Sequence, residues 1–157
     1  MNKQVKIIKQ RISAGGIVVA DNKVLLVHHY QKNEFDFWVL PGGGIEENEG
    51  IFRAAEREVL EETNLKVNAE RIAYMEEFMD DGRYVCKFWV YCRLDQGNLS
   101  TQHKDAEEGF LTDAKFFSKE ELRDMNVFPA ILRDTLWQDL ADEFSVIKYL
   151  GYRQNEK

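Results

Sequence analysis

The sequence predicts an α+β fold, a three-layer α/β/α sandwich around a mixed sheet. Short apolar or alternating runs, typical of strands, fill most of the chain up to Phe117. One strongly helical pattern interrupts them, and helical patterns return only near the C-terminus. The 157 residues show no internal repeat and no linker, so we expect a single domain over residues 1–157.

The N-terminal part predicts four strands separated by turn residues. Asp21, Asn22 and Lys23 form a turn between two apolar runs, and a proline with three glycines stops the last strand at residues 41–44. The expected strands are Val5–Ile12, Gly16–Ala20, Val24–Tyr30 and Phe37–Leu40.

A helical period then runs from about Gly50 to Thr63, with Ile51, Ala55 and Val59 on one side. Asn64 follows at the position where a helix commonly ends in a left-handed residue, which is usually Gly and sometimes Asn. We therefore expect the helix to end there.

The C-terminal part predicts a hairpin, a last strand and a closing helix. Asp80, Asp81 and Gly82 supply the hairpin turn, and Ser118 with Glu121 forms a capping box. Leu99–Glu108 is polar and is expected to be a loop. The expected elements are strands over Ile72–Met79, Arg83–Leu94 and Ala114–Phe117, and a helix over Ala130–Leu140.

Composition limits the classes of partner. The formal net charge is −7, which argues against binding duplex nucleic acid or an anionic membrane surface. The apolar runs are too short for a signal peptide or a membrane span.

The two cysteines are too far apart to form a disulfide with each other. Cys86 and Cys92 lie about 20 Å apart if their strand is continuous. We expect a cytoplasmic protein with reduced thiols.

Three glutamates share one sector of the central helix. With Glu58 at 0°, Glu62 lies at about 40° and Glu61 at about −60°, so Glu58 and Glu62 continue the apolar stripe. Like charges spaced by four residues near a helix C-terminus destabilise it, and a divalent cation would reverse that effect. A solvated acidic face is the alternative, supported by the i,i+4 spacings of Glu49 with Arg53 and of Arg57 with Glu61.

The three glycines before this helix favour a ligand site over a plain acidic face. A glycine backbone can approach a ligand closely and direct carbonyl or amide groups at it. Magnesium prefers oxygen ligands and is bound by one or two carboxylates together with substrate phosphates and water. A strand, a glycine loop and an acidic helix end together supply such a site.

This segment resembles the Nudix box, Gly-x5-Glu-x7-Arg-Glu-U-x-Glu-Glu-x-Gly-U with U aliphatic. Gly43, Glu49 and Arg57–Glu58 occupy its first fixed positions, and Val59–Leu65 supplies the remainder. Asn64 replaces the last glycine, and every other fixed position matches. A chance match anywhere in the chain is on the order of one in a million at average residue frequencies. The resemblance extends from about Ser13 to Leu122.

The resemblance implies a Nudix-like fold and hydrolysis of a nucleoside diphosphate linked to another group. It implies Mg²⁺ or Mn²⁺ as cofactor, a small nucleotide as substrate, and catalytic help from a later acid. The residues it implies are Glu58, Glu61, Glu62 and Gly42 as metal ligands, Glu61, Arg57, Glu49 and Glu108 as catalytic residues, and Gly43, Gly44 and Trp38 as substrate contacts.

Residues outside the box leave alternatives open. Glu107 and Asp113 are further candidates for the late acid, and at most one of His28 and His29 can face a pocket because they alternate along a strand. Phe37, Trp38, Tyr84 and Trp89 suit either base stacking or the core. Arg11, Lys32, Arg83 and Lys87 are the candidate cations for a phosphate, and the sequence does not separate them.

Two other functions fit the same motif. One is a nucleotide-binding regulator without turnover, and the other is an isoprenoid diphosphate isomerase on the same fold. The costly Glu58–Glu62 pair favours the hydrolase, because a module without a metal has no need of it. The substrate within the nucleotide class stays open, as does the choice between monomer and homodimer.

Overall fold

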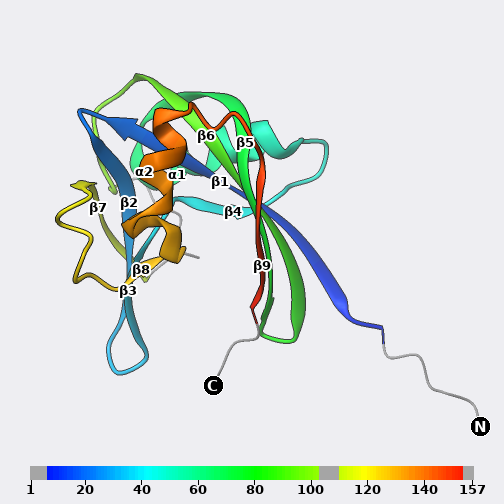
Figure 1. Ribbon diagram of the computed structural model, residues 1–157. Coiled ribbons are helices and arrows are strands. Elements are labelled where there is room, and N and C mark those ends of the chain that lie inside the picture. Colours follow the sequence, from blue (N-terminus) through cyan, green and yellow to red (C-terminus); the bar gives the residue numbers. More distant parts are fainter. Residues whose placement is uncertain (1–6, 103–109, 154–157) are drawn as a thin grey trace, which may run out of the picture.

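The computed structural model describes residues 7–102 and 110–153, and within them strands and helices follow the predicted α+β order. The nine strands of these described residues form one mixed sheet with the order β8-β3-β2-β1-β6-β5-β9, while β4 pairs with β1 and β7 with β2. The two α-helices cover opposite faces of this sheet, α2 in front and α1 behind in Figure 1. The three-layer arrangement is confirmed.

The N-terminal elements correct the prediction at two places. A single strand, β1 (Lys9–Ala20), replaces the two expected strands. The small residues at its centre do not interrupt the strand, because they leave space for a neighbouring side chain. A β-carbon on Gly15, for example, would lie 2.3 Å from the indole of Trp89. The glycine segment is likewise a strand, β4 (Gly42–Gly44), and pairs antiparallel with Ser13–Gly15 of β1.

The other predicted strands are present and mostly longer than expected. β2 (Lys23–Gln31) and β3 (Phe35–Val39) form a hairpin, and β7 (Leu111–Ser118) pairs with β2. β5 (Lys66–Asp80) and β6 (Arg83–Gln96) form the long hairpin whose turn has the left-handed residues Asp81 and Gly82. β6 also pairs with β1 in parallel, which joins the two halves of the chain.

The C-terminal region differs most from the prediction. The expected continuous helix is a 3-10 helix, η2 (Ala130–Arg133), followed by α2 (Thr135–Ala141). Asp134 between them has a non-helical backbone, and the indole N–H of Trp137 donates to the carbonyl of Leu132. β8 (Val127–Phe128) and β9 (Lys148–Arg153) were not predicted. The capping box forms, with Glu121 N–H donating to Ser118 Oγ, but it closes a turn rather than an α-helix.

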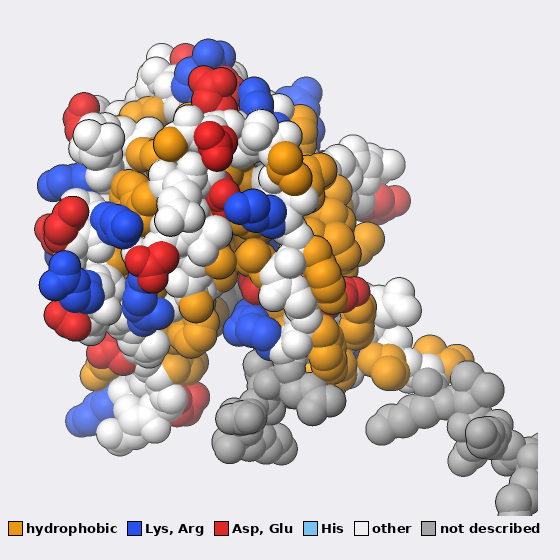
Figure 2. All heavy atoms as spheres, in the orientation of Figure 1, with side chains coloured by type: hydrophobic (Ala, Val, Ile, Leu, Met, Phe, Trp, Pro, Cys, Tyr) orange, Lys and Arg blue, Asp and Glu red, His pale blue; other side chains and the backbone are white. Residues whose placement is uncertain are grey.

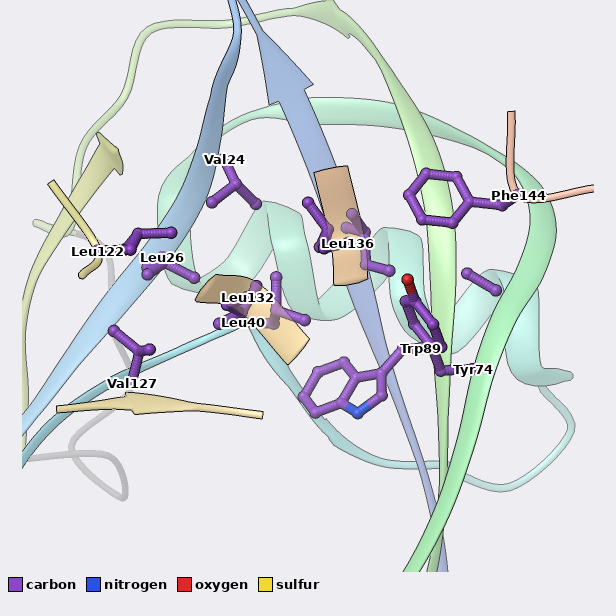
Figure 3. Close-up of a cluster of buried hydrophobic side chains, with 12 residues drawn as sticks. Val24, Leu26, Leu40, Tyr74, Trp89, Leu122, Val127, Leu132, Leu136 and Phe144 are labelled. Atoms are coloured by element: carbon purple, nitrogen blue, oxygen red, sulfur yellow. The ribbon is translucent and has the colours of Figure 1, made fainter. Parts of the chain in front are cut away.

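Two hydrophobic clusters lie on opposite faces of the sheet. Beneath α2, Leu136 faces Trp89 of β6 and Tyr74 of β5 (Figure 3). Beneath α1 (Ile51–Thr63), Ala55 and Val59 pack against Ala14 and Val90. Both clusters include residues of β1, so this strand contributes side chains to the core on each face of the sheet.

The surface is mixed in charge around α2, whereas hydrophobic side chains gather over the strands at the right of Figure 2. Tyr149 is 59% exposed and Ile12 is 53% exposed. None of the helices in residues 7–102 and 110–153 is long and apolar enough to cross a membrane. Cys86 and Cys92 of β6 are both free thiols, as predicted.

Candidate active site

The C-terminal end of α1 is fixed by its cap and by the loop after β6. Asn64 has the predicted left-handed backbone, φ 63°, and its N–H donates to the carbonyl of Leu60. Its side-chain amide donates to the carbonyl of Asn98 at 3.0 Å, and the N–H of Ser100 donates to the carbonyl of Thr63 at 2.9 Å. These bonds hold the turn of α1 that carries the three glutamates.

Arg57 is the centre of a carboxylate cluster. Its guanidinium donates to Glu49 Oε1 at 2.7 Å, to Glu58 Oε1 at 2.9 Å and to Glu61 Oε2 at 3.1 Å. It also donates to the carbonyl of Gly44 at 2.9 Å, which ties α1 to β4. Glu49 therefore pairs with Arg57 across the loop, instead of with Arg53 as its spacing indicated.

Arg57 stabilises the charged carboxylates around it. The hydrogen bonds from Arg57 lower the pKa of the Glu49 carboxyl, and the same bonds raise the pKa of Arg57. One positive charge thus faces the four carboxylates of Glu46, Glu49, Glu58 and Glu61, so the cluster has an excess of acidic groups. Such an excess of acidic groups attracts a divalent cation.

Glu58 and Glu62 are buried, as their place on the apolar stripe predicted. Their exposed fractions are 5% and 2%, whereas the side chain of Glu61 is 52% exposed. Glu58 lies against the glycine strand: a β-carbon on Gly43 would come within 2.4 Å of its Oε1 atom. Gly43 is therefore required to leave space for a buried carboxylate.

Gly42 and Gly43 also line a cavity of about 470 Å³, a size ordinary for small-molecule sites. The cavity has an aromatic side and a cationic side. Phe35, Phe37, Phe78, Phe110 and His29 contribute the rings, and Arg11 and Lys87 contribute the positive charges. Its single acid among the described lining residues is Asp80, which pairs with Arg83 at 3.2 Å.

Lys87 links the cavity to the glutamates. Burial lowers the pKa of its amine, whereas the charges of Glu62, Glu76 and Glu58 raise it. The amine lies 4.3 Å from the centre of the Trp89 ring. The sequence named Lys87 and Arg11 among four cations, and the structure distinguishes these two because both line the cavity.

Trp38 is not among the described residues that line the cavity, and its place among the substrate contacts stays a prediction. Neighbouring residues of a strand face opposite sides, so Phe37 lines the cavity while Trp38 stacks on His28, with a ring separation of 4.6 Å. By the same alternation His29 lines the cavity and His28 pairs with Asp36 at 2.7 Å. Trp89 belongs to the core, and Tyr84 donates to Glu77.

The candidates for the late acid are separated only in part. Asp113 pairs with Lys115 at 3.0 Å and accepts from the N–H of Ala114, so its carboxylate is engaged within β7. Glu107 and Glu108 lie outside the described residues.

The aromatic residues of the cavity are the main set that the sequence did not predict. Phe35, Phe78 and Phe110 come from three separate segments, and only the fold brings them to one cavity.

The donor set fits a hard divalent cation. Within the described part of the chain, no three Asp, Glu, His or Cys side chains already form a metal shell. Glu58 and Glu61 instead direct oxygens at Arg57, and Gly43 leaves Glu58 the space that a β-carbon would fill. Magnesium-type ions need few protein carboxylates, because water and substrate oxygens complete their octahedron.

Comparisons with known proteins agree with this fold. The model of the NUDIX domain family matches residues 9–136. Nudix hydrolase 5 from Arabidopsis thaliana is 30% identical over 115 residues, 71% of this chain, and the chain spans 37% of that relative's length.

Two solved structures show the same fold. A NUDIX hydrolase from Nitrosomonas europaea has a TM-score of 0.70 and 22% identity, covering 85% of this chain and 90% of that one. An ADP-ribose pyrophosphatase from Streptococcus suis has a TM-score of 0.64 and 21% identity, covering 91% of this chain and 98% of that one.

Proposed function

This chain belongs to the NUDIX family, and we propose that it hydrolyses the pyrophosphate bond of a nucleoside diphosphate derivative with a divalent cation. The substrate class includes nucleotide sugars, ADP-ribose, dinucleotides and nucleoside triphosphates, and the cofactor is Mg²⁺ or Mn²⁺. The observation that carries the proposal is the buried Glu58 carboxylate, held between Arg57 and Gly43 beside a cavity with a cationic side.

In this proposal Glu58, Glu61 and Glu62 hold the cation, with the backbone carbonyl of Gly42 as a further ligand. A bound divalent cation supplies charge neutralisation of the pyrophosphate and an activated water. Arg57 orients the carboxylates, because its guanidinium already bonds Glu58 and Glu61. Glu49 acts through Arg57, to which its carboxylate is bonded at 2.7 Å.

The reaction adds water to phosphorus and breaks one P–O bond of the anhydride. The proton leaves the attacking water for a carboxylate, and we assign this role to Glu61, the most exposed of the three helix glutamates, with Glu108 as the additional acid. Gly43 and Gly44 let the substrate approach the backbone closely. The aromatic side of the cavity supports a nucleobase, since stacking tolerates any base.

The likeness to an ADP-ribose pyrophosphatase supports ADP-ribose as the first substrate to test. Two free thiols support a reducing compartment, and we place the protein in the cytoplasm on that ground.

The test is a screen for binding and hydrolysis over ADP-ribose, nucleotide sugars, dinucleotides, nucleoside triphosphates and isopentenyl diphosphate with Mg²⁺, Mn²⁺ or EDTA. We expect release of a nucleotide or phosphate from at least one substrate only when a divalent cation is present. Binding without turnover would favour the regulator, and conversion of isopentenyl diphosphate without phosphate release would favour the isomerase. Either result would exclude the proposed hydrolysis.

A further inference from the structure

Two cations from neighbouring strands face the cavity together. β1 and β6 run parallel, with Arg11 opposite Val85 and Ser13 opposite Lys87. Residues two apart on a strand point to the same side, so Arg11 and Lys87 lie diagonally on one face of the sheet. Arg11 also lies against β4, because a β-carbon on Gly44 would come 2.8 Å from its Nε atom.

Among the described residues, neither Arg11 nor Lys87 forms an ion pair with a carboxylate. In residues 7–102 and 110–153, no carboxylate oxygen lies within 4.0 Å of a nitrogen of Arg11 or of Lys87. Glu76 lies opposite Lys87 in the register, but Trp89 Nε1 donates to it at 3.1 Å and Arg153 pairs with it at 3.5 Å. The charges of Glu62 and Glu58 still act on Lys87, but no ion pair within the described residues occupies either side chain, which leaves both open to a ligand.

The other candidate cations are engaged or remote. Arg83 pairs with Asp80, and Arg57 is bonded to the carboxylate cluster. Lys32 is exposed in the turn between β2 and β3 and does not line the cavity. Selection of Arg11 and Lys87 thus follows from their position rather than from their residue type.

We propose, on the basis of the proposed function, that Arg11 and Lys87 form a cation clamp that binds the phosphate groups of the substrate independently of the metal. A guanidinium offers a planar fork for phosphate oxygens, and an ammonium offers a compact point charge. A half-buried position strengthens both interactions because less water screens them. The clamp orients the substrate, with its phosphates toward the glycine strand and its organic group toward the phenylalanines.

The clamp is tested by equilibrium binding without hydrolysis. ADP and inorganic pyrophosphate are titrated into the full chain in EDTA by calorimetry, with Lys87→Met, Arg11→Gln and the matched surface control Lys32→Gln. We expect each clamp substitution to weaken binding about tenfold or more, the effect of one lost hydrogen bond to a charged group. Lys32→Gln removes the same charge and should bind within about twofold of the unmodified chain.

Arg11→Lys guards against misfolding as an explanation, because it keeps the charge and should recover part of the affinity lost in Arg11→Gln. Circular dichroism checks that each variant is folded. The proposal is overturned if the unmodified chain binds neither probe in EDTA, or if folded Lys87→Met and Arg11→Gln bind as well as Lys32→Gln. These outcomes are independent of turnover, so a chain that binds through the clamp but hydrolyses nothing would contradict the proposed function alone.

Discussion

Gly43 and Glu58 are in contact across the junction of β4 and α1, and the carboxylate occupies the place where a side chain at position 43 would begin. We predict that Gly43→Ala moves Glu58, because a β-carbon 2.4 Å from Oε1 is too close to be accommodated in place. The free energy of unfolding should fall by about 1–3 kcal/mol, as for other overpacked sites. Hydrolysis should fall as well.

Gly50→Ala is the matched control for this change, because a β-carbon on Gly50 meets nothing within 4 Å. Its kcat should match that of the unmodified chain. Thermal denaturation and steady-state kinetics measure both effects, and a Gly43→Ala variant with unchanged stability and kcat would contradict the close packing.

Glu58→Gln and Glu62→Gln should each separate stability from activity. Both changes keep the side-chain shape and relieve a like-charge pair on α1, so the free energy of unfolding should hold or rise by a few tenths of a kcal/mol. Turnover should fall about 10²-fold or more, equivalent to roughly 2.7 kcal/mol of transition-state stabilisation.

The exposed Glu47→Gln, within the same segment, is the control for loss of one negative charge. It should leave kcat unchanged. Full metal-dependent hydrolysis by both Glu58→Gln and Glu62→Gln would mean that these carboxylates form only an acidic helix face.

Asn64 should tolerate glycine better than alanine. Gly adopts the left-handed backbone without cost but loses the hydrogen bond to Asn98, so Asn64→Gly should change the free energy of unfolding by less than about 1 kcal/mol. Asn64→Ala loses the same bond and also incurs the left-handed penalty, for a total of about 2 kcal/mol. Chemical denaturation distinguishes them, and equal losses would show that backbone conformation is irrelevant there.

The two thiols should differ in reactivity. Burial raises the pKa of the Cys92 thiol to about 12, and burial also raises the pKa of Cys86, which is more accessible. Only thiolates react with disulfide reagents. At pH 8 we therefore expect Cys86 to react slowly, faster as pH rises, and Cys92 to stay unmodified until the chain is denatured.

Denatured, unreduced protein should then give two reactive thiols. Cys86→Ser should abolish reaction of the folded chain, whereas Cys92→Ser should preserve it. Rapid labelling of both cysteines in the folded protein would contradict the burial of Cys92.

The sequence predicted the features that depend on local signals. The end of α1 followed from Asn64, whose side chain tolerates a left-handed backbone, and the burial of Glu58 and Glu62 followed from helical periodicity. Strand β9 escaped prediction because its exposed tyrosines and its glycine give no clear alternation. The split between η2 and α2 lies at the non-helical backbone of Asp134, beside the hydrogen bond from the Trp137 indole to the carbonyl of Leu132, and hydrophobic periodicity reports neither feature.

The cavity could not be predicted from the sequence, because it depends on the pairing of strands that are distant in the chain, and local patterns do not encode that pairing. Alternation places Phe37 and Trp38 on opposite faces of β3, but it does not say which face meets the cavity. Phe37 lines the cavity, whereas Trp38, the aromatic residue chosen from the sequence as a substrate contact, stacks on His28. Likewise, Arg11 and Lys87 look like any surface cations until the register of β1 with β6 is known.

The parallel pairing of β1 with β6 also bears on the order in which the site comes into existence. During synthesis, α1 with its glutamates is made before Lys87. Until β6 is made, β1 lacks the strand with which it forms its long parallel pairing. Closing so long a loop is entropically unfavourable, and contacts distant in sequence slow folding. The residues of the carboxylate cluster, which span Gly44 to Glu61, are therefore all synthesised before Lys87, whereas α1 gains the packing of Val90 only once β6 has joined β1.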